Sequence, residues 1–216
     1  MFKTIMSTAV LAASVFSASA YANTTAAPFV DVIDSAEFNG WNKLVSPLTA
    51  AQLAAGYTAN VADSSDAVLT RIAGSAYPAG GGLYQWQGTE STFTLTDTTI
   101  ASGLSSVVFQ SHSAPGGTGT GVYGVSLTYT IGGLDYVAAL VDSNDASAEY
   151  KYFSWDLSSL TGIEAISVQF STEVHANSFA FQLDQVVAAV PEPSEYALLL
   201  GGLALVGFAA RRKQQA

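Results

Sequence analysis

The sequence predicts a mainly β protein, an antiparallel β-sandwich of the jelly-roll-like type, flanked by two segments outside the domain. Three observations support this prediction. Apolar and polar residues alternate over many short runs, Gly, Ser and Asp residues separate those runs, and only one segment of the domain has the pattern of a helix. The chain has 216 residues, of which about 165 remain without the flanking segments, enough for one domain with a sizeable core.

The clearest strand pair is a hairpin over residues 122–131 and 134–141. Its first arm alternates apolar residues with Ser and Thr, which is the period of a strand. Gly132 and Gly133 join the arms and supply the positive φ that a tight hairpin turn needs. We expect four apolar side chains of the second arm on its inner face: Leu134, Tyr136, Ala138 and Leu140. The other predicted strands are residues 29–33, 67–73, 82–87, 91–96, 105–112, 150–156, 166–171 and 178–187.

One helix is predicted near residues 47–55. Ser46 stands at the cap position, Pro47 at the first helical position and Gly56 just past the end. Two glycine-rich stretches, residues 77–82 and 113–121, are predicted loops. Neither leads into a helix, so they do not indicate a nucleotide site.

The first 22 residues have the pattern of a secretory signal peptide. Lys3 supplies the positive charge near the start, and residues 5–16 supply the apolar run. Small residues follow in the pattern that a signal peptidase cleaves, with Ala20 and Ala22 as candidate cleavage residues and Ala22 favoured. We therefore expect export through the Sec machinery and a folded domain over residues 23–188.

The end of the chain, residues 189–216, has the pattern of a membrane-anchoring tail. Pro191, Glu192 and Pro193 form an extended spacer, because proline cannot enter the interior of a helix. A single transmembrane helix is predicted over about residues 195–210, which include the uncharged apolar run of 14 residues from Ala197 to Ala210. These rise roughly 21 Å, less than the roughly 30 Å of bilayer hydrocarbon, so the anchor is weak. A basic cluster follows and should stay in the cytoplasm: Arg211, Arg212 and Lys213.

The order of Pro-Glu-Pro, a short Gly- and Leu-rich span and a terminal Arg-Arg-Lys resembles the PEP-CTERM sorting signal of Gram-negative bacteria. The resemblance covers about an eighth of the chain. It implies that an exosortase, a membrane protease-transpeptidase, recognises the motif and removes the tail, as other hydrophobic C-terminal signals are removed. The protein would be held in the inner membrane first and reach the cell surface or extracellular matrix afterwards. The implied setting is exopolysaccharide or biofilm.

The composition excludes several classes of function. The chain carries 7 Lys and Arg against 17 Asp and Glu, a net charge of −10, so nucleic acid is not an expected partner. It has no Cys, which excludes cysteine-based redox and metal chemistry. An acidic domain with few lysines is typical of extracellular proteins that meet neutral polymers or divalent cations.

Catalytic motifs are absent from the sequence. There is no Gly-x-Ser-x-Gly and no His-Glu-x-x-His pattern. The two histidines lie far apart, and we interpret His112 as a strand-end residue and His175 as a turn residue. We therefore expect a non-catalytic protein, with a secreted hydrolase as the least favoured alternative.

A group of oxygen-bearing residues after the hairpin is a candidate calcium site. Such side chains are the ligands that Ca²⁺ prefers. A solvated turn is the plainer interpretation of the same residues, and no organic cofactor is expected. The candidate ligands are Asp142, Asn144, Asp145 and Glu149.

A pair of aromatic residues is a candidate glycan site. Tyr84 and Trp86 share one face of a predicted strand, and Gln85 and Gln87 share the other. An exposed aromatic face would stack on sugar rings, whereas a buried one would be ordinary packing, the more frequent use of aromatic residues. The main hypothesis is a non-catalytic surface or matrix protein, and the alternative is a calcium-assisted carbohydrate-binding module.

Overall fold

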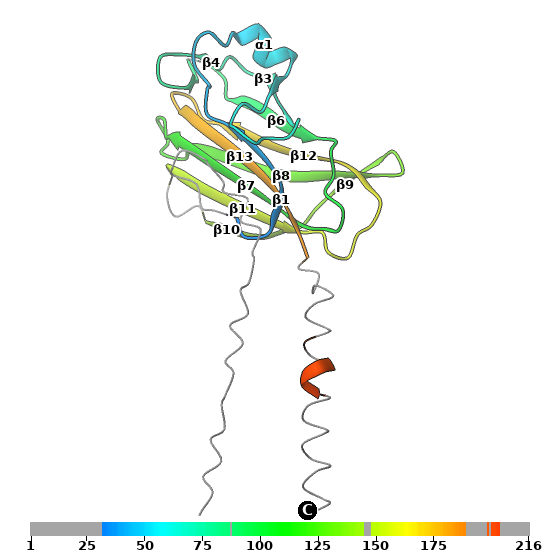
Figure 1. The fold of residues 1–216 in the computed structure, drawn as a ribbon. Helices are drawn as coiled ribbons and strands as arrows, with labels where there is room; N and C mark the ends of the chain where they lie inside the picture. Colours follow the sequence, from blue (N-terminus) through cyan, green and yellow to red (C-terminus); the bar gives the residue numbers. More distant parts are fainter. Residues whose placement is uncertain (1–31, 87, 145–147, 189–197, 199, 204–216) are drawn as a thin grey trace, which may run out of the picture.

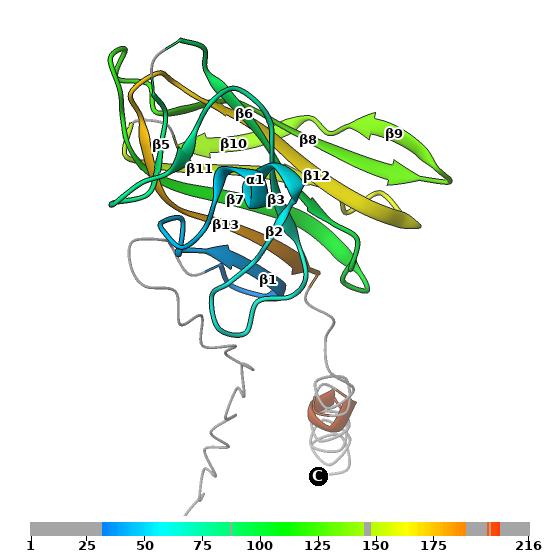
Figure 2. The same cartoon turned by 90° about the horizontal axis from the view of Figure 1, so that it is seen from above.

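The structure, a computed structural model, describes residues 32–86, 88–144, 148–188, 198 and 200–203. Within them two antiparallel sheets lie in two layers with the core between them (Figures 1 and 2). This confirms the prediction of a mainly β, two-sheet sandwich with little helix. The predicted signal peptide, the Pro-Glu-Pro spacer and the basic cluster lie outside the described residues.

The seven-stranded sheet has the order β10-β11-β7-β13-β5-β4, and β1 pairs with β13 beside this path. Strand β13 therefore has partners along both of its edges. The strands of this sheet are β1 (Ser35–Trp41), β4 (Tyr77–Pro78), β5 (Leu83–Tyr84), β7 (Leu104–Ala114), β10 (Leu140–Asn144), β11 (Tyr150–Asp156) and β13 (Asn177–Val187).

The six-stranded sheet has the order β2-β3-β6-β12-β8-β9. One short helix, α1 (Ala50–Ala55), places Leu53 in the core beside this sheet. The strands are β2 (Tyr57–Thr58), β3 (Val68–Ala73), β6 (Ser91–Asp97), β8 (Val122–Ile131), β9 (Leu134–Val137) and β12 (Ile163–Thr172).

Aromatic rings from both sheets meet in the core. The Phe170 ring of β12 lies with its centroid 5.4 Å from Phe93, 5.0 Å from Phe109 and 4.8 Å from Phe181. Phe93 belongs to the same sheet as Phe170, whereas Phe109 and Phe181 belong to the opposite sheet. These rings therefore hold the two layers together, mainly through the apolar area they bury.

A buried carboxylate also joins the two sheets. Asp97 of β6 accepts hydrogen bonds from Asn39 Nδ2 of β1 at 2.9 Å and from Gln185 Nε2 of β13 at 2.8 Å. Burial raises the pKa of Asp97, and hydrogen bonds from Thr99 and Gln185 oppose that rise. Since all three side chains are fully buried, losing one partner would leave a buried polar group unsatisfied.

The two predicted elements nearest the start of the domain are displaced in the structure. Of the predicted strand 29–33, Ile33 lies in an exposed turn and residues 29–31 lie outside the described residues; the strand is β1 instead. The helix begins after Thr49 rather than after Ser46. The reason is a reciprocal cap, in which the Gln52 amide N–H donates to Thr49 Oγ1 and the Thr49 amide N–H donates to Gln52 Oε1.

The prediction of one continuous strand over residues 134–141, with four apolar side chains facing the core, is wrong in two respects. This segment divides into β9 and β10, which belong to different sheets. Leu134, Tyr136 and Leu140 are exposed, and Leu134 has 63% of its surface accessible. The β8–β9 hairpin extends past the end of the sandwich (Figure 1), so Leu134 and Tyr136 of β9 find no opposing sheet there. Leu140 is exposed on β10, an edge strand of the seven-stranded sheet. Ala138 alone packs against the core as predicted.

Most of the predicted transmembrane helix, about residues 195–210, lies outside the described residues. Residues 198 and 200–203 are helical. Among the described residues, no helix is both long enough and apolar enough to cross a membrane.

Phe170→Ala should destabilise the domain strongly, because it removes a ring that contacts both sheets and leaves a cavity. We expect a loss of about 3–5 kcal/mol in the free energy of unfolding, measured by urea denaturation of the purified protein. The matched control is Tyr136→Ala on the exposed part of β9, which removes a ring contact with Tyr129 and should lower it by about 1 kcal/mol or less. Equal losses in the two variants would contradict this description of the core.

Candidate functional site

The aromatic pair predicted from the sequence lies on the outer face of the seven-stranded sheet. Leu83 and Gln85 point inward and are buried, so Tyr84 and Trp86 point outward. Trp86 has 51% of its surface exposed, whereas Trp41 and Trp155 are 0% and 1% exposed. Of the two interpretations of this face, the structure therefore supports the exposed one.

Four side chains form a cluster, here called the aromatic platform: Tyr77, Tyr84, Trp86 and His175. The Tyr84 ring is central, with its centroid 6.2 Å from that of Tyr77, 5.9 Å from that of Trp86 and 6.4 Å from that of His175. The Tyr84 hydroxyl also lies 3.1 Å from His175 Nδ1, a hydrogen-bonding distance. The contacts hold exposed rings in a fixed arrangement on the surface.

Gln85 fixes the segment that carries Trp86. Its side-chain Nε2 donates to Ser75 Oγ at 3.2 Å and also to the Thr89 carbonyl, while Oε1 accepts from the Ser91 hydroxyl. Its backbone N–H donates to Ala176 O at 2.9 Å, and its carbonyl accepts from the His175 N–H at 2.8 Å. The buried glutamine thus ties the Trp86 segment to the turn that carries His175.

A second buried side chain, Glu173, orders the loop beside the platform. Its carboxylate accepts from the backbone N–H of Gly116 at 2.7 Å and of Thr118 at 2.8 Å, and also from the Thr118 hydroxyl and the Gly121 N–H. Burial acts to raise the pKa of Glu173, but these hydrogen bonds favour the charged form and lower it to about 2. A Cβ on Gly116 would collide with the Val174 carbonyl, so the loop needs glycine there.

The predicted calcium ligands are only partly placed. Asp142 and Asn144 lie on the exposed strand β10, and Glu149 is exposed just before β11. Asp145 lies outside the described residues. Among the residues that the structure describes, no three metal-ligating side chains of His, Cys, Asp or Glu come together.

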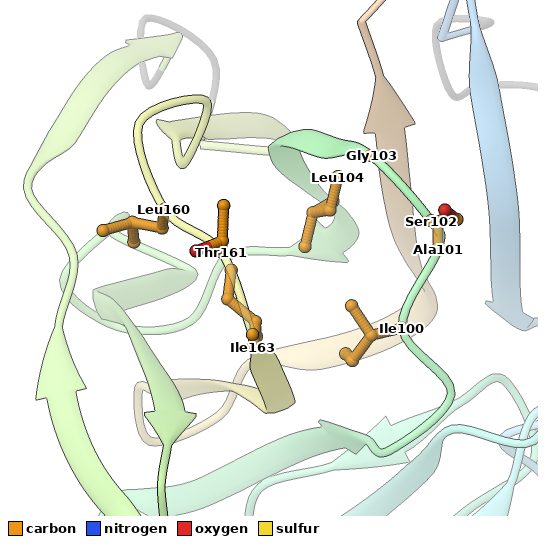
Figure 3. A pocket seen from close by; sticks show the side chains of 9 residues that line it. Ile100, Ala101, Ser102, Gly103, Leu104, Leu160, Thr161 and Ile163 are labelled. Carbon is orange, nitrogen blue, oxygen red and sulfur yellow. The ribbon is translucent and has the colours of Figure 1, made fainter.

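A pocket of about 300 Å³ lies at the far end of β7 from the platform. Leu104, at the start of β7, lines it, whereas the platform lies near the end where β7 finishes. Figure 3 shows Ile100, Leu104 and Ile163 pointing toward one another. None of the described residues lining this pocket has an ionisable side chain.

Comparison with protein families finds the PEP-CTERM protein-sorting motif at residues 189–213. The chain carries a PEP-CTERM sorting signal. The resemblance drawn from the sequence is therefore confirmed, and the matched region contains the predicted spacer, Pro191 to Pro193, and the basic cluster, Arg211 to Lys213. The matched region covers the tail alone, so the motif says nothing about the function of the sandwich.

The comparisons with curated proteins and with solved structures assign no family to the sandwich. No curated protein matches the chain. Among solved structures the chain is similar to a mutant of CBM29-2, a family 29 carbohydrate-binding module, with 9% identity and a TM-score of 0.26 over 69% of this chain and 79% of that one. A likeness this distant carries no argument about function.

Glu173→Gln should remove a pH-dependent part of the stability. The unfolded carboxyl takes up a proton near pH 4.5 and the folded one only near pH 2, so the contribution is complete above pH 4.5 and is lost as the pH falls toward 2. We expect the wild type to have the higher Tm near pH 7, with a gap that shrinks between pH 4.5 and pH 2. Calorimetry of both proteins from pH 7 to pH 2 measures this difference in Tm. A constant gap would show that the carboxylate is not held as described.

Proposed function

We propose that this protein is exported, held in the inner membrane by its tail, processed by an exosortase, and retained at the surface or in the matrix as a non-catalytic glycan-binding protein. The sorting half of this proposal follows from the PEP-CTERM motif. The signal-peptide pattern of residues 1–22 supports export by the Sec machinery, and the basic cluster supports a cytoplasmic C-terminus. Exopolysaccharide or biofilm is the setting that the motif implies.

The exposure of Trp86 carries the binding half of the proposal. Soluble proteins seldom leave a fixed group of large aromatic rings exposed without a use for it. Tyr and Trp combine a flat apolar face with a polar edge, and this suits sugar rings, which have apolar C–H faces and polar rims. The hydrogen bond between Tyr84 and His175 keeps two of these rings in place before any ligand arrives.

The negative net charge of the protein favours a neutral ligand over an acidic one. The chain has a net charge of −10, and its few cations offer little to an acidic polymer. Lys151, on β11, is buried and shares the inward-facing positions of Phe153 and Trp155. Arg71, on the six-stranded sheet, donates to the Ala76 carbonyl. We therefore assign a neutral polysaccharide as the ligand class. The proposal does not involve calcium.

Trp86→Ala should weaken polysaccharide binding without unfolding the protein. Native gels that contain the producing bacterium's own exopolysaccharide, galactomannan, xylan or mixed-linkage β-glucan should retard the wild type. We expect the variant to lose about tenfold or more in affinity, because a stacking face is removed. Since Trp86 is half-exposed, the Tm should change little.

Two matched variants control this experiment. Trp86→Phe keeps a ring and should retain part of the retardation, and Tyr136→Ala removes an exposed ring from the other sheet and should behave as the wild type. Equal retardation of Trp86→Ala and wild type by the polysaccharide would count against the platform as the binding site.

A further inference from the structure

A second aromatic group lies on the seven-stranded sheet: His112 on β7, Tyr150 on β11 and Phe179 on β13. The His112 and Tyr150 rings stack with centroids 4.4 Å apart and an angle of 15° between their planes. The Phe179 ring lies 4.8 Å from His112 at an angle of 54°. Tyr150 is 39% exposed, and the other two are half-buried.

The strand register places this group on the same outer face as the platform. Tyr150 pairs with His112 across β11 and β7, and paired residues of antiparallel strands point to the same side. Phe109, three residues before His112, belongs to the core, so His112 points outward. Tyr84 also points outward, on β5, which pairs with β13.

Phe179 connects the two groups. It occupies the irregularity in β13 between Ser178 and Ala180, where one residue is added to the strand. Phe181 and Leu183 of the same strand are buried in the core, whereas the Phe179 ring contacts His112 on the outer face.

The platform hairpin lies directly beside that ring. A Cβ on Gly81, in the turn between β4 and β5, would come within 4.0 Å of Phe179 Cε1. The aromatic side chains therefore follow one another across β11, β7, β13, β5 and β4, which are neighbours in the sheet. Figure 2 labels the first four of these strands. At about 4.8 Å per strand the row extends roughly 19 Å.

We propose that the two groups form one elongated site for the interior of a neutral polysaccharide chain, which crosses the strands from Tyr150 to Tyr77. This rests on the proposed function and names the form of its ligand. The row is longer than a single sugar, and it lies on a sheet face rather than in a pocket. The pocket of Figure 3 is at the other end of β7. A surface of this kind suits the middle of a polymer better than a free sugar or a chain end.

The charge beside the second group also disfavours acidic polymers. Glu149 precedes Tyr150 in the chain and lies close enough to His112 to act on its pKa, although burial is the larger effect and lowers that pKa. A uronic acid chain crossing here would meet this negative charge, whereas a neutral chain would not.

Chain length tests the proposal. Oligosaccharides of two to eight sugars from galactomannan, xylan and mixed-linkage β-glucan are titrated calorimetrically into the full-chain protein, in a detergent without a sugar headgroup. For the series that binds, we expect affinity to rise about tenfold or more between two and six sugars, as the ligand reaches the second aromatic group. Tyr150→Ala should lose most of that rise, and Tyr150→Phe, which keeps the ring, should retain it. Tyr136→Ala should follow the wild-type curve.

The outcomes separate this inference from the function on which it rests. Affinity that stops rising at two sugars, or a Tyr150→Ala variant that follows the wild-type curve, overturns the elongated site. In either case a loss of binding in Trp86→Ala keeps the proposed function. If the wild type binds none of these oligosaccharides and no polysaccharide retards it in gels, both proposals fail.

Discussion

Strand β13 is the element on which the rest of the sandwich depends. It pairs with β7 along one edge and with β1 and β5 along the other. From its inner face Phe181 packs into the ring cluster, and Gln185 donates to the buried Asp97 of the opposite sheet. This strand, which precedes the sorting tail, therefore lies inside one sheet and binds it to the other. The domain cannot be complete until the chain has been synthesised almost as far as the tail.

The same strand connects the aromatic platform to the segment that carries the sorting motif. Asn177, at its start, pairs with Tyr84 of the platform, and Val187, at its end, lies two residues before the matched sorting motif begins. Eleven residues of strand extend roughly 35 Å. In the account we propose, the tail holds one end of the sandwich at the membrane while the platform is carried at the other end, where polymers outside the cell can reach it.

The sequence was enough to predict the sandwich, most of its strands and the sorting motif, because period-2 alternation and a linear motif are local properties. Other features depend on contacts between distant segments. The pairing of Tyr77 with Tyr84 could have been inferred from Gly80, Gly81 and Gly82 as a hairpin turn, but Glu173 and His175 join the site only through the fold. The exposed second arm after Gly133 was missed because alternation shows which side chains share a face without showing whether another sheet covers it.

The central claim is that the mature protein is the sandwich alone, delivered outside the membrane with its binding face intact and its tail removed. Intact-mass analysis of the protein recovered from the matrix of the producing bacterium tests this most directly. The account predicts a chain that starts near residue 23 and ends near Pro191–Pro193, with or without an attached group, and a longer chain in cells that lack the exosortase. A mature protein that still contains residues 194–216 in cells with an active exosortase would contradict it.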